Sequence, residues 1–203
     1  MIYHGIDGGS RTGAHAWVWQ EGGAWCASSR PWETVEQHDA IVREIISVGG
    51  STGPWRAEAP LVHGVPQATI AQARDVGLWE FVARQCRATL ELVPSSVWRA
   101  CYVIPDSDAK EAARRSREWA EALWPDCRLA AGDHESDARL IALSQSPEGV
   151  RWAQDRARER APWLLVAARR ESLGRRGAYG RHSAARRSRD GWTERDVLDR
   201  GGR

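Results

Sequence analysis

Three acidic residues and one histidine are spaced along the chain so that they could form a single catalytic site. Asp7 closes a short apolar strand, Glu58 closes another, and His134 and Asp137 lie on a late helix. His134 and Asp137 are three residues apart, so both side chains lie on one face of that helix. Carboxylates and an imidazole that meet at one point can hold divalent metal ions for phosphodiester hydrolysis. The residues therefore predict a metal-dependent phosphodiester hydrolase.

A sheet must bring these residues together, and the sequence predicts its strands and helices. Alternating and β-branched runs predict strands over 2–7, 14–19, 24–28, 55–59 and 89–93. Apolar residues at helical spacing predict helices over 32–48, 69–87, 106–123, 133–145 and 147–170, the last bent at Pro162, and a short helix over 193–200.

The order of these elements predicts an α/β fold, with a mixed five-stranded sheet flanked by helices. The first three strands would be antiparallel, and the next two would be parallel to the first. In that arrangement the ends of the first and fourth strands lie side by side. Asp7 and Glu58 would then face each other.

Charge divides the chain of 203 residues into two parts. Residues 1–150 carry 14 basic and 20 acidic residues, a net charge of −6, whereas residues 151–203 carry 15 and 7, a net charge of +8. We therefore predict a nuclease domain over 1–147, followed by a C-terminal helix and an Arg-rich extension over 148–203. Arg175 to Arg189 would run along a polyanion such as DNA; a solvated basic end is the alternative.

Composition also bears on the compartment. No run approaches the roughly 18 apolar residues that a membrane span needs, and Asp7 and Arg11 interrupt any secretory signal. The four cysteines are widely spaced and form no CxxC pair, which speaks against structural zinc and a disulfide framework. A cytoplasmic protein without a membrane partner is expected.

Four segments resemble motifs of the RuvC-type Holliday-junction resolvases, which belong to the ribonuclease H-like superfamily. They are GIDGGSRTGAHAWV at 5–18, RAEAPL at 56–61, QARDVG at 72–77 and DHESDA at 133–138. The resemblance covers residues 1 to about 145. Gly8 stands where the family usually has Pro, Asp75 stands where it has Gly, and Leu61 stands where it often has a junction-wedging aromatic residue.

The resemblance implies a ribonuclease H-like fold and a homodimeric endonuclease that resolves four-way DNA junctions by paired symmetric nicks. The products would carry 5′-phosphate and 3′-hydroxyl ends. Each site would hold two Mg²⁺ ions, for which Mn²⁺ could substitute: Asp7 bridging both, Glu58 on one, and Asp137 on the other with His134 beside it. If His134 is not a ligand, Asp133 is the first substitute.

DNA contacts are predicted at five further positions. Arg74 and Lys110 match family positions near the DNA, and Arg114 continues the helix of Lys110. Trp98 and Arg99 could stack on a base or sugar. The alternatives are a solvated charged face for the helix and core packing for Trp98.

Three other functions remain open from the sequence. One is a less selective branched-DNA nuclease on the same fold. Another is an actin-like or sugar-kinase-type phosphate-binding protein, because GIDGGSRTG also resembles the first phosphate loop of that fold. A second acidic Gly-rich loop, which such a kinase needs, is missing from the sequence. The third is a DNA-binding paralogue that has lost activity.

Overall fold

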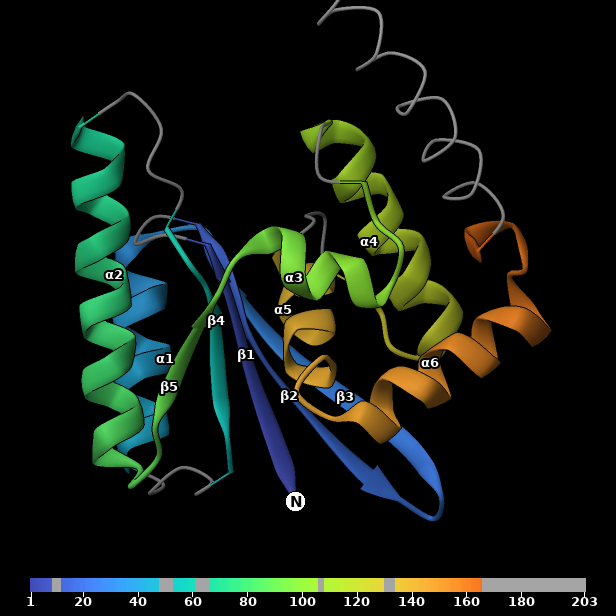
Figure 1. Ribbon diagram of the computed structural model, residues 1–203. Coiled ribbons are helices and arrows are strands. Elements are labelled where there is room, and N and C mark those ends of the chain that lie inside the picture. The colour runs from blue at the N-terminus through green and yellow to red at the C-terminus, as the bar shows by residue number, and fades with distance from the viewer. Residues whose placement is uncertain (9–11, 48–52, 61–65, 106–107, 130–133, 166–203) are drawn as a thin grey trace, which may run out of the picture. The chain divides into compact units, whose positions relative to one another are not determined.

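The computed structural model describes residues 1–8, 12–47, 53–60, 66–105, 108–129 and 134–165 (Figure 1). The chain divides into two units, Met1–Leu165 and Val166–Arg203. The second unit lies outside the described residues, and so do the predicted helix over 193–200 and the predicted DNA contact of Arg175 to Arg189. The division into a nuclease domain over 1–147 and an extension over 148–203 stays a prediction.

Five strands form one mixed sheet, in the order β3-β2-β1-β4-β5. β1, β2 and β3 are antiparallel neighbours, whereas β4 and β5 run parallel to β1. This confirms the predicted sheet. The strands are β1 (Ile2–Gly8), β2 (Gly13–Glu21), β3 (Ala24–Trp32), β4 (Trp55–Glu58) and β5 (Leu90–Val93). The β2–β3 turn is made by Gly22 and Gly23, both at positive φ, which glycine adopts without strain.

Six helices accompany the sheet in the described part of the chain: α1 (Val35–Ser47), α2 (Pro66–Gln85), α3 (Ser95–Cys101), α4 (Ala109–Leu123), α5 (His134–Leu143) and α6 (Pro147–Arg160). α3 was not predicted, because its seven residues are too few to show a helical repeat. The last helix was predicted to bend at Pro162 and continue. α6 ends at Arg160, with Ala161 non-helical, because a residue that precedes proline avoids the α conformation. Residues 163–165 are helical again, and the rest of the predicted helix lies outside the described residues.

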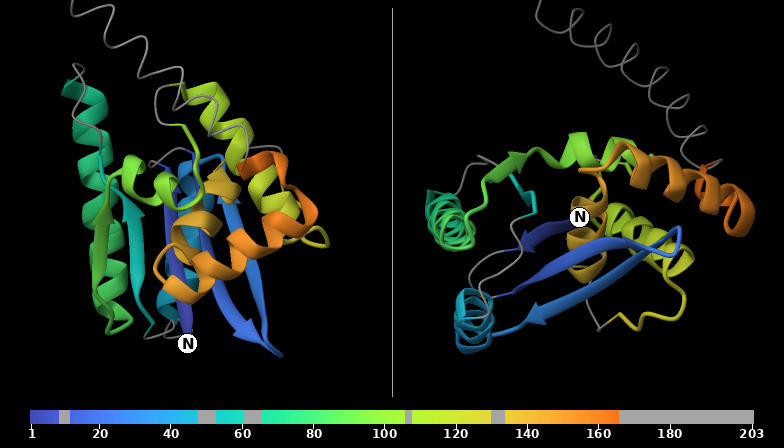
Figure 2. Two further views of the ribbon diagram at one scale, coloured as in Figure 1. Left: turned by 45° about the vertical axis from the view of Figure 1, so that its right-hand side comes forward. Right: turned by 90° about the horizontal axis from the view of Figure 1, so that it is seen from below.

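The helices cover the two faces of the sheet separately, with α1 and α2 on one side and α4, α5 and α6 on the other (Figures 1 and 2). α6 packs Ala153 and Ala157 into the same core as α4 and α5, so it belongs to the body of the first unit. Within the described residues, no helix combines the length and apolar character needed to cross a membrane.

Successive side chains of β1 point to opposite faces of the sheet and therefore pack against different helices. Tyr3 packs on the core beside α4, α5 and α6, and Gly5 lies against α5. Ile6 packs with Trp55 and Trp79 on the side of α1 and α2. Since successive side chains of a strand point to opposite faces, Asp7 shares the face of Gly5.

Candidate active site

Close packing of α5 on β1 brings the two parts of the candidate site together. A Cβ atom at Gly5 would lie 2.0 Å from the carbonyl oxygen of Ala138 and 2.5 Å from the backbone nitrogen of Ala142. Ala14, Ala16 and Ala138 form a cluster of small buried residues at the same contact. Only a strand without bulky side chains here lets the helix backbone come this near. α5 therefore starts directly beside the end of β1.

His134, the first residue of α5, contacts the carboxylate of Asp7. Its Nδ1 lies 2.7 Å from Asp7 Oδ2, and the side chains are 38% and 13% exposed. The contact fits an imidazole N–H that donates to a carboxylate oxygen. Two residues 127 positions apart in the chain are thus joined as the sequence anticipated.

Glu58 reaches the same edge of the sheet from β4. The parallel pairing of β1 with β4 sets Ile6 opposite Ala57, which places Asp7 and Glu58 at neighbouring strand ends. The indole Nε1–H of Trp98 donates to Glu58 Oε2 at 3.1 Å. Trp98 is fully buried, so its ring has no face to offer a base, and it contacts the candidate site from within the core.

Asp137 is the most deeply buried of these carboxylates. Its pKa is raised well above the usual range, first by burial and then by the negative charge of Asp7, with a smaller contribution from Glu58. The hydroxyl of Ser116 and the guanidinium of Arg99 offset part of this effect. Arg99 Nη2 lies 3.7 Å from Asp137 Oδ2. The carboxylates from β1, β4 and α5 are therefore close enough to repel one another.

A cavity of about 290 Å³ opens at this point and is lined by Asp7, Glu58 and His134. Asp75 of α2 also lines it, although the sequence had marked this residue only as a departure from a family motif. Burial raises the pKa of Asp75 to about 7, and its Oδ1 lies 3.6 Å from Nε2 of the buried His38. No sequence pattern marks Asp75 as a lining residue, because its burial depends on how α2 packs against the sheet.

The donor set suits a hard divalent cation. Carboxylate oxygens are what Mg²⁺ prefers, and Oδ1 of Asp137 is buried without a hydrogen-bond partner in the described part of the chain. Among those same residues, however, no three His, Cys, Asp or Glu side chains are already grouped closely enough to hold a metal ion. Asp7, Glu58 and Asp137 instead each contact a protein side chain. Asp133, the alternative to His134, lies outside the described residues.

Comparison with known proteins gives the fold. No family model matches the sequence, and no curated protein sequence does. Among solved structures, RuvC of Thermus thermophilus in complex with a Holliday junction substrate aligns over 71% of this chain and 92% of its own, with a TM-score of 0.54 and 15% identity. A second Thermus thermophilus RuvC structure aligns over the same shares, with a TM-score of 0.53 and 16% identity.

This chain has the RuvC fold. The predicted ribonuclease H-like α/β architecture is thereby confirmed: a mixed five-stranded sheet with helices on both faces. At such low identity the likeness to RuvC concerns the fold alone, so the chemistry must be argued from the side chains of this chain.

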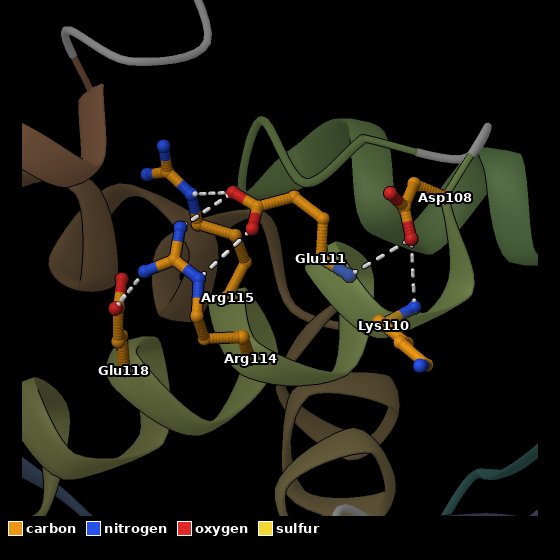
Figure 3. Close-up of polar contacts among 6 residues, drawn as sticks. All are labelled: Asp108, Lys110, Glu111, Arg114, Arg115 and Glu118. Atoms are coloured by element: carbon orange, nitrogen blue, oxygen red, sulfur yellow. Dashed lines mark hydrogen bonds and ion pairs between the residues drawn. The ribbon is translucent and has the colours of Figure 1, made fainter.

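The predicted DNA contacts occupy different environments on this RuvC fold. Arg74 of α2 and Lys110 of α4 are exposed. Arg114 forms ion pairs with Glu111 and Glu118 of its own helix (Figure 3). Lys110 lies apart from those ion pairs, and its backbone N–H is capped by Asp108. The negative charges of Glu111 and Glu118 thus balance the positive charge of Arg114. The side chains of Arg74 and Lys110 are exposed to solvent.

Proposed function

We propose that this protein is a metal-dependent, structure-specific endonuclease that resolves four-way DNA junctions by paired symmetric nicks. The observation that carries the proposal is the convergence of Asp7, Glu58 and Asp137 on one edge of a RuvC-fold sheet, close enough for their charges to interact. Acidic residues are not usually buried together unless a cation or a proton offsets their repulsion. The RuvC structure in complex with a Holliday junction supports the choice of substrate.

In this proposal Asp7, Glu58 and Asp137 would hold two Mg²⁺ ions, or Mn²⁺ in their place. The ions would stabilise the negative charge that develops on the attacking and leaving oxygens of the phosphate. His134 fixes the orientation of the Asp7 carboxylate through its Nδ1 contact. The products would carry 5′-phosphate and 3′-hydroxyl ends.

A homodimer completes the proposal. A four-way junction presents two equivalent strands, and a two-fold dimer places one site at each of them. Arg74 and Lys110 are proposed to contact the DNA backbone, because both are exposed cations. Arg99 is proposed to approach the scissile phosphate, since it already contacts Asp137.

A less selective branched-DNA nuclease is the second candidate. The ion pairs of Arg114 and the burial of Trp98 withdraw two of the five side chains that were predicted to contact DNA. Fewer such contacts favour weaker discrimination between DNA structures. The acidic site would serve either enzyme.

Cleavage of defined DNA substrates tests the proposal. A synthetic four-way junction, a linear duplex and a single strand are incubated with wild type, Asp7→Asn or Asp39→Asn, with Mg²⁺ or Mn²⁺. Asp39, an exposed acid of α1, is the control. We expect paired nicks in the junction alone, lost by a factor of about 1,000 or more in Asp7→Asn while binding persists.

Other outcomes of this experiment have defined meanings. Cleavage of all three substrates would select the less selective nuclease. No cleavage with either metal would refute the enzyme and leave a junction-binding protein or the actin-like, phosphate-binding alternative.

A further inference from the structure

Two adjacent residues of α3 reach two acids that come from different elements. Trp98 donates its indole N–H to Glu58 at the end of β4. Arg99 lies 3.7 Å from Asp137 on α5. The Arg99 guanidinium carbon also lies 5.1 Å from the centre of the Trp98 ring. This short helix therefore contacts two acids from different elements, and one of them, Glu58, lines the cavity.

The bond from Trp98 differs from the environment of other buried indoles. Trp98, Trp79 and Trp119 are all fully buried. The N–H groups of Trp79 and Trp119 have no hydrogen-bond partner in the described part of the chain, whereas that of Trp98 is directed at a carboxylate. The core thus tolerates indoles without a partner, so packing alone does not account for the contact with Glu58.

The position of Glu58 explains why such a contact matters. It is the last residue of β4, so its side chain stands where the strand ends. A carboxylate with several rotamers at a strand end loses entropy when it must bind a cation in one orientation. The buried ring of Trp98 is rigid, and its N–H donates to Oε2 of Glu58.

We propose that Trp98 is a positioning residue that fixes the Glu58 carboxylate toward the acidic cavity before a cation binds. The consequence of this role for catalysis rests on the proposed nuclease function. The orientation of the Glu58 carboxylate by Trp98 does not depend on that function. The predicted stacking of Trp98 on DNA is replaced by this role inside the protein.

A matched pair of variants tests the catalytic consequence. Trp98→Phe and Trp119→Phe remove the same atoms from fully buried rings of one core cluster, but only the first removes a hydrogen bond to an acid. We expect Trp98→Phe to raise the Mg²⁺ concentration for half-maximal junction cleavage about tenfold. Its rate at saturating Mg²⁺ should stay within about twofold of wild type, and Trp119→Phe should leave the Mg²⁺ requirement unchanged.

Three results would overturn the proposal: an unchanged requirement in Trp98→Phe, a lowered one, or equal increases in both variants. A lowered requirement would mean that the indole competes with the cation. Urea unfolding of both variants checks that each is folded under the assay conditions.

A spectroscopic test separates this proposal from the nuclease function. The chain has 12 Trp residues, so the indole N–H signal of Trp98 in a ¹H–¹⁵N spectrum is assigned by its loss in Trp98→Phe. Glu58→Gln should shift that signal and leave the Trp119 signal in place. An unmoved Trp98 signal refutes the positioning role even if the protein cleaves junctions. A shifted signal in a protein that cleaves nothing supports the contact and refutes only the nuclease.

Discussion

The two faces of the sheet are packed in opposite ways. On the side of α5, the strands carry Gly5, Ala14 and Ala16, and the helix backbone comes into direct contact with them. On the side of α1 and α2, rings fill the space: His4 stacks on Trp55 with centroids 4.4 Å apart, and His15 lies close to both. Small residues allow a helix to deliver polar groups to the sheet edge, whereas large rings keep helices away and provide the core.

Alternation within β1 and β2 produces this difference. Gly5 pairs with Ala16 and Asp7 pairs with Ala14, so the small residues and the acid share one face. Ile6 pairs with His15 on the other face. A shift of one residue in register would place Asp7 among the rings and remove it from Glu58 and Asp137. The register of one hairpin therefore determines whether the site exists.

The largest effect is expected from filling the contact between Gly5 and α5. Gly5→Ala places a methyl group 2.0 Å from the Ala138 carbonyl oxygen, and we expect a loss of about 3 kcal/mol in the free energy of unfolding. Gly77→Ala on α2 is the control, because nothing lies within 4 Å of its Cβ position. That change should stabilise the protein by about 0.5–1 kcal/mol. Urea unfolding measures both, and similar values would contradict the difference between the faces.

The ring-packed face should make the protein sensitive to acid. Burial lowers the pKa of His4 to about 4 and that of His15 well below 6.5. These values lie below those of the unfolded chain, so the unfolded chain takes up protons first. The stabilisation is complete above pH 6.5 and is lost as the pH falls toward 4, on the order of 3 kcal/mol for His4.

A double variant, His4→Leu with His15→Leu, isolates that effect. Between pH 7 and pH 4.5 the wild type should lose more of its unfolding free energy than the variant does. The difference is the quantity to measure, because Asp75, with its pKa raised to about 7, acts in the opposite direction in both proteins. A difference that is constant with pH would show that these rings are not shielded from protons.

The smallest effect is expected from Asp137→Asn in protein treated with a chelator. Replacing a buried carboxyl group whose charged form is disfavoured by burial and by the charges of Asp7 and Glu58 should raise the free energy of unfolding by about 1 kcal/mol. Glu135→Gln is the control on the same helix, because Glu135 is buried but accepts a hydrogen bond from Ser29 at 2.6 Å. That variant should lose about 1 kcal/mol. If the free energy of unfolding changed in the same direction in both variants, the result would contradict the view that the acidic site reduces the stability of the protein.

Local patterns predicted the sheet and part of the site. Alternation and turn glycines gave β1 to β3, and the parallel course of β1 and β4 followed from the order of the elements, which placed Asp7 beside Glu58. Helical spacing put His134 and Asp137 on one helix. Strands and helices depend on residues that are close in sequence. The strand order could be predicted because the rules for connecting strands leave few possible topologies.

Contacts across the core could not be predicted. α3 is one short helix without a repeat, so the bonds of Trp98 to Glu58 and of Arg99 to Asp137 had no local signature. Asp75 lies in a long helix where only tertiary structure shows that it borders the cavity. The partners of Trp98 and Arg99 lie 40 and 38 residues away in the chain. These contacts depend on how α3 packs against its neighbours, and the periodicity of apolar residues carries no information about that packing.

Titration calorimetry with Mn²⁺ on wild type and Asp7→Asn distinguishes a cation site at the acidic cavity from a group of acids that binds no cation. Two ions should bind per wild-type chain, and binding should be lost when the Asp7 carboxylate is neutralised. Absence of Mn²⁺ binding in wild type, or equal binding in Asp7→Asn, would contradict the cation site.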